Sequence, residues 1–293
     1  MRLNELQIGR RMDKARAFVE EGKLLHAEQI YRRLIQEEPG FVGAYSELAT
    51  IFAESSRPEA SIEVLNHARK QFPESIELTF MLGNVFLREA RHDEALSCYK
   101  KIVDSKLPHV HFNMGVAYFL KGNLKSAEAQ FRITLGRNPN FPKINEYMGE
   151  LLITRKSYAE AVQHLHRGIT IDPYSRTAHF LLGTAYHATS NLKKAYDEFV
   201  MAIDMDPNDA EGWYKCGEVL IELKRYDEAE KYTRKALELD PDSADALVNL
   251  GQLFLLRGNH ARSEECFLKA LSLNPRHSRA RMGRIQSKSA RKG

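Results

Sequence analysis

The sequence predicts an all-α protein built from a repeated pair of helices. The first observation is a period: prolines stand 34 residues apart, except for one gap of 66, at residues 39, 73, 139, 173, 207, 241 and 275. The second is a pair of positions in each period that holds small residues. The third is a set of large apolar residues at helical spacing from those small ones. Fixed self-similarity of this length indicates a repeat architecture.

The period divides the chain into eight units when each is numbered 1 to 34 with the proline at position 32. The predicted units are residues 8–41, 42–75, 76–107, 108–141, 142–175, 176–209, 210–243 and 244–277, of which the third is two residues short. Residues 1–7 are expected to extend the first helix. Residues 278–293 are expected to form a basic capping helix and tail.

The first helix of each unit is indicated by positions 8 and 11. Position 8 holds Ala15, Ala49, Gly83, Gly115, Gly149, Gly183, Gly217 and Gly251. Position 11 holds Phe18, Phe52, Phe86, Tyr118, Leu152, Tyr186, Leu220 and Phe254. Positions three or four residues apart share a helical face, so this helix presents a core-facing stripe.

The second helix is indicated by positions 20, 24 and 32. Position 20 is Ala or Ser in every unit, and position 24 is large and apolar except for Thr233. Small residues at positions 8 and 20 predict that the two helices approach closely. Proline at position 32 cannot continue a helix and disfavours helical geometry in the residue before it. Each unit therefore reads as helix, turn, helix and proline.

This signature resembles the tetratricopeptide repeat (TPR) family. Trp213, Gly217, Ala229, Ala236 and Pro241 of the seventh unit stand where that family's pattern puts them. The resemblance implies an α-solenoid, a right-handed superhelix whose first helices line a concave groove. Neighbouring units must stack, because one unit cannot bury its apolar face alone. The first unit departs most, with Arg11 and Lys14 at usually apolar positions.

Composition and charge favour a soluble, folded protein. Apolar residues make up 43% of the chain and charged residues 28%. Residues 276–293 carry seven Lys or Arg and no acid, so the rest of the chain sums to about −3. Three cysteines are too few for a disulfide framework or a zinc site. We expect no secretory signal, no membrane span and a cytoplasmic location.

No residue pattern indicates catalysis. Phosphate-binding, dinucleotide-binding, zinc-protease and serine-hydrolase motifs are absent from the sequence. The pairs His109/His111 and His164/His166 are two residues apart and point to different helical faces, so we expect surface or groove histidines. Cys216 is expected to be a packing residue. The sequence therefore predicts no catalytic residue, no metal and no cofactor.

The family geometry would place positions 2, 5, 6, 9, 12 and 13 on the groove. The candidate partner-binding residues there are Phe80, Asn84, Phe112, Asn113, Phe119, Lys143, Tyr147, Glu150, Phe180, His187, Tyr214 and Glu218. Aromatic residues are typical interface anchors. The alternative is that several of them pack between first helices and are partly buried.

Acidic residues share this surface, namely Glu146, Glu150, Glu211, Glu218 and Glu222. They indicate an extended or helical partner that is partly apolar and partly basic. Some TPR proteins bind a C-terminal carboxylate through a clamp of Lys, Arg and two Asn. Asn84, Asn113 and Lys143 match three of those five positions, but Phe80 and Tyr147 occupy the other two, which argues against a clamp.

Three functions remain open from the sequence. The first is a non-enzymatic adaptor that holds a partner protein or peptide in the groove. The second is a self-assembling scaffold whose basic C-terminal end docks in a neighbour's groove. The third is a nucleic-acid-associated factor that uses the basic tail. We expect a helix over residues 278–287, packed on the second helix of the eighth unit through Ala280, Met282 and Ile285, and frayed from Lys288.

Overall fold

The computed structural model describes residues 3–105 and 107–291, and all the regular structure in those residues is helical. The helices are α1 (Glu5–Glu20), α2 (Leu24–Glu37), α3 (Val42–Glu54), α4 (Pro58–Gln71), α5 (Ile76–Arg88), α6 (His92–Lys101), α7 (Pro108–Leu120), α8 (Leu124–Arg137), α9 (Ile144–Thr154), α10 (Tyr158–Ile171), α11 (Arg176–Ala188), α12 (Leu192–Met205), α13 (Ala210–Glu222), α14 (Tyr226–Leu239), α15 (Ala244–Leu256), α16 (His260–Leu273) and α17 (Ser278–Ala290).

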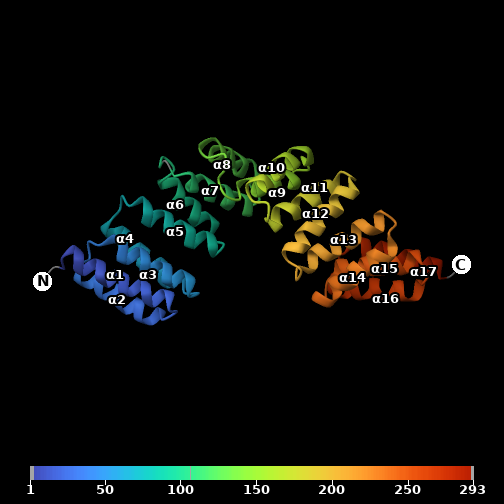
Figure 1. Cartoon of the computed structure of the whole chain (residues 1–293), viewed down its shortest axis with the longest axis horizontal. Coiled ribbons are helices and arrows are strands. Elements are labelled where there is room, and N and C mark those ends of the chain that lie inside the picture. Colours follow the sequence, from blue (N-terminus) through green and yellow to red (C-terminus); the bar gives the residue numbers. More distant parts are fainter. Residues whose placement is uncertain (1–2, 106, 292–293) are drawn as a thin grey trace. The chain divides into compact units, whose positions relative to one another are not determined.

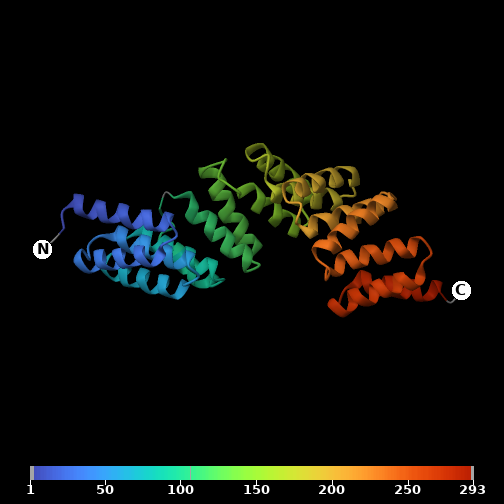
Figure 2. The ribbon, with the colours of Figure 1, turned by 60° about the horizontal axis from the view of Figure 1, so that its bottom comes forward.

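The helices pack in consecutive pairs, so each predicted unit holds one odd-numbered first helix and one even-numbered second helix. Figures 1 and 2 show the two helices of each pair side by side. The chain divides into two compact units, one that ends at Phe141 and one that begins at Pro142. Helices α1 to α8 belong to the first unit and α9 to α17 to the second.

The prolines at position 32 end the second helices, as the sequence predicts. The residue before each of these prolines is the C-cap, and its backbone is outside the helical region, as at Asn138 (φ −147°, ψ 98°) and Asp172 (φ −130°, ψ 91°). The clash between proline and its predecessor excludes helical geometry there. In several units the residue at position 34 then caps the next helix, as where the Ser175 hydroxyl accepts from Ala178 N at 3.1 Å.

The turn inside each pair has a feature that the sequence analysis missed. Position 15 has a positive φ in all eight units, at Gly22, Ser56, Ala90, Gly122, Lys156, Ser190, Lys224 and Gly258. Only three of these are glycine, the residue that adopts this geometry without cost. Because serine, alanine or lysine occupies the position in the other five units, no repeated glycine marks the turn in the sequence.

The small residues at positions 8 and 20 lie where the two helices of a pair touch. A Cβ on Gly83 would stand 2.5 Å from the Tyr99 ring, and one on Gly183 would stand 2.7 Å from the Phe199 ring. Thus the large residue at position 24 lies directly on position 8. Position 20 meets the same backbone, because the Ser61 hydroxyl donates to Ala49 O at 2.7 Å.

The third unit is shorter than the others because its second helix contains fewer residues. Helix α6 spans 10 residues, whereas α4 and α8 each span 14. Pro108 follows at the first turn of α7, where its missing N–H costs no helical hydrogen bond. The two-residue deletion is therefore absorbed without changing the pairing of the helices.

Helix α17 packs on α16 and buries Ala280, as predicted, but Met282 and Ile285 do not make the contact and the helix is longer than predicted. It continues to Ala290, so the predicted fraying from Lys288 is wrong. Met282 and Ile285 are 63% and 65% exposed, and small residues make the contact instead. A Cβ on Gly283 would stand 2.3 Å from the Phe267 ring, and Ser287 Oγ lies 2.7 Å from Ser263 Oγ.

Candidate partner-binding surface

The twelve predicted partner-binding residues all belong to first helices or to their caps. Phe80 and Asn84 lie on α5, and Phe112, Asn113 and Phe119 lie on α7, in the first compact unit. The other seven lie in the second unit: Lys143, Tyr147 and Glu150 at α9, Phe180 and His187 on α11, and Tyr214 and Glu218 on α13. Eleven are partly buried, and Lys143 is exposed.

The aromatic residues of the first unit are both packed and partly exposed. The Phe80 ring centroid is 6.0 Å from that of Tyr99. The Phe112 centroid is 6.0 Å from that of Phe131 and 4.8 Å from that of Phe141. Tyr99 and Phe131 are the large position-24 residues of their units. One edge of each surface ring therefore rests on the core, while part of the ring stays accessible.

Asn84 and Asn113 are joined to each other rather than left open for a ligand. The Asn84 side-chain oxygen accepts from Asn113 Nδ2 at 2.7 Å and from the Tyr99 hydroxyl at 2.8 Å. This bond links α5 to α7, so the two asparagines hold neighbouring units in register. Their likeness to a carboxylate clamp is explained by this structural role.

Charged and aromatic groups alternate on the first helices of the second unit. The Phe180 ring lies 5.5 Å from the Phe199 ring and is partly exposed. His187 Nε2 lies 2.7 Å from a Glu222 carboxylate oxygen. Tyr214 donates its hydroxyl to Glu211 at 3.3 Å. This surface offers flat apolar groups with acids between them.

Among the described acids of this surface, Glu150 has neither an ion pair nor a side-chain hydrogen bond, whereas Glu146 and Glu211 each accept a hydrogen bond from a hydroxyl. It is partly buried on α9, and its carboxylate has no ion pair or hydrogen bond within residues 3–105 and 107–291. Burial raises the pKa of this carboxyl, with no charged neighbour to offset it. The charge of Glu150 also contributes to the raised pKa of the partly buried Tyr147, after burial itself. An ionised carboxylate in such a place gains from an added cation.

Glu218 differs, because its counter-charges come from the same chain. Lys215 Nζ is 3.0 Å from one carboxylate oxygen, and Arg279 of α17 pairs with the other. Burial alone would raise the pKa of Glu218, but the charges of Lys215 and Arg279 outweigh it and hold the pKa below its usual range. Part of the basic C-terminal end therefore lies against the seventh repeat of its own chain.

The predicted surface histidines include one that is buried. His111 is 4% exposed, and its Nδ1 lies 2.8 Å from Gln130 Oε1. His164 Nδ1 lies 3.0 Å from Asn145 Oδ1. Both contacts join position 4 of a first helix to position 23 of its second helix. The sequence analysis expected surface or groove histidines and did not foresee that His111 would be buried against a polar partner.

No chemistry beyond binding is indicated by the cysteines and histidines. Cys98 and Cys216 are buried, and all three cysteines are unpaired. Burial raises the pKa of each thiol, so none is activated as a nucleophile. Among the described residues, no three or more His, Cys, Asp or Glu are placed to hold a metal ion. None of the helices of residues 3–105 and 107–291 has the length and apolarity that a membrane crossing requires.

Comparison with protein-family models shows which family the repeats of this chain belong to. One tetratricopeptide repeat model matches residues 209–276, and a second matches residues 12–76, 80–142 and 112–176. Together they cover most of the helical pairs described above. The chain belongs to the tetratricopeptide repeat family. The all-α solenoid class expected from the sequence is confirmed by this match and by the helices.

Relatives of this TPR chain share its repeats over part of their length. The BBSome complex member BBS4 of Bos taurus is 24% identical over 223 residues, which are 73% of this chain and 43% of the relative. The chain spans less than half the length of the first curated relatives that it matches. Their repeats, and not their whole proteins, are therefore what this chain resembles.

Solved structures show the same fold. The anaphase-promoting complex hetero-tetramer Cut9–Hcn1 matches with a TM-score of 0.67 at 15% identity, over 94% of this chain and 55% of that one. YrrB, described as a TPR protein with an unusual peptide-binding site, matches with a TM-score of 0.54 at 21% identity, over 64% of this chain and 97% of that one.

Arg279 is the residue of this TPR surface that the sequence analysis did not assign. Its guanidinium donates to Asn249 Oδ1 at 3.1 Å and approaches Gln252 Oε1 at 3.5 Å, besides its pairing with Glu218. The sequence contained an indication of this role. If the repeat numbering continues past residue 277, Arg279 falls at position 2, which is one of the groove positions. Helix α17 thus presents its arginine as the first helix of a ninth repeat would.

Proposed function

We propose that the chain is a non-enzymatic adaptor that holds a segment of a partner protein against its first helices. The observation that carries this proposal is Glu150, a partly buried carboxylate with no cation among the described residues. A charge held in this way costs stability, and such groups gather at functional sites. A basic side chain of a partner would supply the missing charge.

The neighbouring aromatic residues support an apolar contribution to the same contact. Phe180 and Tyr147 are partly exposed on adjacent first helices of the second unit. Partly exposed rings on a rigid helical scaffold are favourable anchors, because little side-chain entropy is lost when they are covered. The proposed partner segment is therefore extended or helical, with both apolar and basic side chains.

The descriptions of similar proteins agree with this class of function. BBS4 is named as a member of a complex, Cut9–Hcn1 is a hetero-tetramer, and YrrB is described with a peptide-binding site. We extend to this chain only the shared theme of holding another polypeptide.

Site-specific photo-cross-linking tests the proposal. A benzophenone amino acid is placed at residue 180 or at the control residue Tyr174, which is 83% exposed in the turn before α11. Native extract is then irradiated with each protein. We expect one polypeptide to cross-link through residue 180 and not through 174, and to be lost when Glu150→Gln is added. Equal cross-linking from both positions would contradict the proposal.

The double variant Phe112→Ala with Phe180→Ala measures how much the aromatic side chains contribute to partner binding. We expect partner capture to fall more than tenfold, since two anchors are removed. The fold should survive, because neither residue belongs to the repeat signature. Unfolding of the double variant would show that the rings serve the core, where Phe112 and Phe180 rest on Phe131 and Phe199.

Self-assembly and nucleic-acid binding remain predictions with their own tests. The pairing of Arg279 with Glu218 leaves the basic end less charge to offer a neighbour. Light scattering over a hundredfold range of concentration would reveal self-assembly as a rising mass. Salt-sensitive binding to generic DNA would favour the nucleic-acid function.

A further inference from the structure

The contact between Arg279 and Glu218 joins fixed positions of successive first helices. Glu218 stands at position 9 of the seventh repeat, and Arg279 stands 61 residues later, at position 2 of the helix that follows the eighth repeat. Asn249 stands between them, at position 6 of the eighth repeat, and accepts from the same guanidinium at 3.1 Å. Positions 9, 6 and 2 of three successive first helices thus form one set on the partner-binding surface.

Two contacts in the first compact unit show that the set is a property of the repeat. Arg16, at position 9 of the first repeat, donates to Glu47, at position 6 of the second, at 2.8 Å. Asn84, at position 9 of the third repeat, accepts from Asn113, at position 6 of the fourth, at 2.7 Å. In the two sets that contain an ion pair, around Arg16 and Arg279, the cation is an arginine of the same chain.

The set that begins at Glu150 holds two acids and no cation. Position 9 of the fifth repeat is Glu150, position 6 of the sixth is Leu181, and position 2 of the seventh is Glu211. Glu150 and Glu211 have the same separation along the chain as Glu218 and Arg279. Neither of the two acids has an ion pair in the part of the chain that the structure describes. This set therefore lacks the arginine that the ionic sets contain.

Glu150 also lacks the second cation that accompanies Glu218. Lys215, at position 6 of the seventh repeat, lies 3.0 Å from Glu218 on the same helix. The equivalent residue of the fifth repeat is Tyr147. Burial therefore raises the pKa of the Glu150 carboxyl, whereas at Glu218 the charges of Lys215 and Arg279 outweigh burial and lower the pKa.

An aromatic ring beside this set suits the flat face of a guanidinium. Val248, at position 5 of the eighth repeat, lines the same pocket as Arg279. The equivalent residue of the sixth repeat is Phe180, whose ring is partly exposed. Arginine stacks on aromatic rings, and its planar fork of donors serves two acceptors at once, whereas lysine offers a compact point charge. The set thus favours arginine over lysine.

We propose that Glu150, Glu211 and Phe180 bind one arginine side chain of the partner segment. The guanidinium lies between the two carboxylates, with its flat face on the Phe180 ring. Arg279 is the internal model for this contact, since its guanidinium occupies the equivalent place at the end of the array. This inference rests on the proposed function, because it names the residue that the partner segment presents.

Nuclear magnetic resonance of the full chain tests the site without the partner. The methyl groups of Leu181 are observed while Nα-acetyl-arginine methylamide is added. The corresponding lysine and citrulline compounds serve as a cation of different shape and a neutral compound of the same shape. We expect saturable shifts with a Kd of about 1–10 mM for the arginine probe, as suits a single side chain. The lysine probe should bind at least threefold more weakly, and the citrulline probe at least fivefold.

Three variants locate the binding of the arginine probe. Glu150→Gln and Glu211→Gln should each raise its Kd at least threefold, because each removes one carboxylate of the set. Glu160→Gln changes an exposed acid on α10, which is a second helix, and should leave the Kd unchanged.

The variant Glu211→Arg tests the same geometry within the chain. It places an arginine at position 2 opposite Glu150, as Arg279 stands opposite Glu218. We expect its urea midpoint to rise above that of Glu211→Gln, and the rise to disappear when Glu150→Gln is added. Thr177→Arg is the matched control, since it adds an arginine at position 2 of the sixth repeat, and position 9 two repeats earlier is Val116. This control should show no rise.

The results that would overturn the proposal are distinct from those that would overturn the adaptor function. Equal Kd values for the arginine and lysine probes would show no selection of a guanidinium. No saturable shift up to about 50 mM arginine probe, or no rise in the midpoint of Glu211→Arg, would show that the set binds no arginine. A polypeptide that still cross-links through residue 180 would then leave the adaptor function standing. Binding of the arginine probe without any cross-linked polypeptide would support the site and contradict that function.

Discussion

At the scale of single residues, the glycines at position 8 are fixed by the ring that lies on them. Gly183 is covered by Phe199, which is itself fully buried and has no space to move away. Gly136 on α8 has no atom within 4 Å of where a Cβ would stand. The two glycines are thus helical residues with opposite surroundings.

We predict that Gly183→Ala destabilises the protein and that Gly136→Ala does not. Alanine gains up to about 1 kcal/mol of helix propensity at either site. At Gly183 an overpacking cost of about 1–3 kcal/mol opposes that gain. Urea unfolding should therefore show a loss for Gly183→Ala and a small gain for Gly136→Ala. A gain for both would mean that the ring shifts freely.

Glu150 is expected to lower the stability of the folded protein at neutral pH and to contribute to partner binding. Burial raises the pKa of its carboxyl, so the folded state favours the protonated form. The resulting stability is fully present below the unfolded pKa and is lost as pH rises through the raised folded pKa.

Replacing Glu150 with glutamine should therefore stabilise the protein at pH 7. The gain should shrink as pH falls and vanish below the ordinary glutamate pKa of about 4.3, where both side chains are neutral. Urea unfolding at pH 7 and pH 3.5 measures it, with Glu160→Gln as the control at an exposed acid of α10. A destabilised Glu150→Gln at pH 7 would show that the carboxylate has a cation partner in solution.

At the scale of elements, α17 packs on α16 as a first helix packs on the second helix before it. Its opposite side differs from that of a first helix. Ala280 and Ser287 are buried against α16, where positions 3 and 10 of the internal first helices are also buried. Positions 7 and 11, which are apolar in most units, hold Arg284 and Lys288. Charged residues at these positions suit a face that no described helix covers.

We predict that deletion of residues 278–293 lowers the melting temperature more than Arg279→Gln does. The substitution removes the charge-assisted bonds to Glu218, worth about 1–3 kcal/mol. The deletion also uncovers Phe267 and the apolar side of α16. Circular dichroism melting of the three proteins compares them, and a truncated chain that melts like the full one would rule out a capping role.

At the scale of the whole molecule, helices contact mainly their neighbours in the sequence. Stability in such an array is close to a sum of repeat and interface contributions. Ala95 and Ala195 are fully buried at position 20 of the third and sixth repeats, one in each compact unit.

We therefore predict that Ala95→Leu and Ala195→Leu each weaken one part of the chain. Overpacking at either site should cost about 1–3 kcal/mol. Hydrogen exchange should accelerate near α5 and α6 in the first variant and near α11 and α12 in the second, with α16 and α17 unchanged in Ala95→Leu. Uniform acceleration over all helices would instead show one cooperative unit.

The repeat register, the helical pairs, the close contact at position 8 and the end of seven second helices before a proline can all be read from the sequence. These features depend on residues within one 34-residue unit, so a period read along the chain contains them. Cys216 was likewise assigned to the core from its position alone, and it is fully buried.

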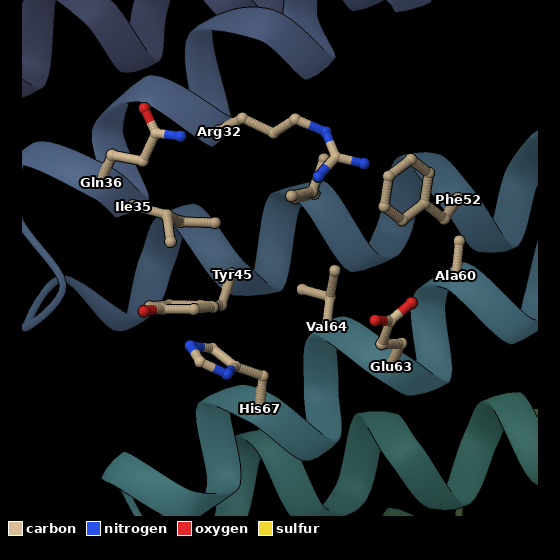
Figure 3. A pocket seen from close by; sticks show the side chains of 10 residues that line it. Arg32, Ile35, Gln36, Tyr45, Phe52, Ala60, Glu63, Val64 and His67 are labelled. Atoms are coloured by element: carbon tan, nitrogen blue, oxygen red, sulfur yellow. The ribbon is translucent and has the colours of Figure 1, made fainter.

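The contacts between side chains of neighbouring units, and the depth at which each side chain lies, follow from the three-dimensional packing. Arg279 reaches Glu218 across 61 residues, and Ser287 is buried on α17 where Met282 and Ile285 are exposed. The half-buried state of Phe112 and Phe180, and the cavity over Tyr45 between α2 and α4 (Figure 3), arise from the sizes of side chains on neighbouring helices. Packing of this kind depends on shapes in three dimensions, and a one-dimensional pattern of apolar and polar positions does not contain them.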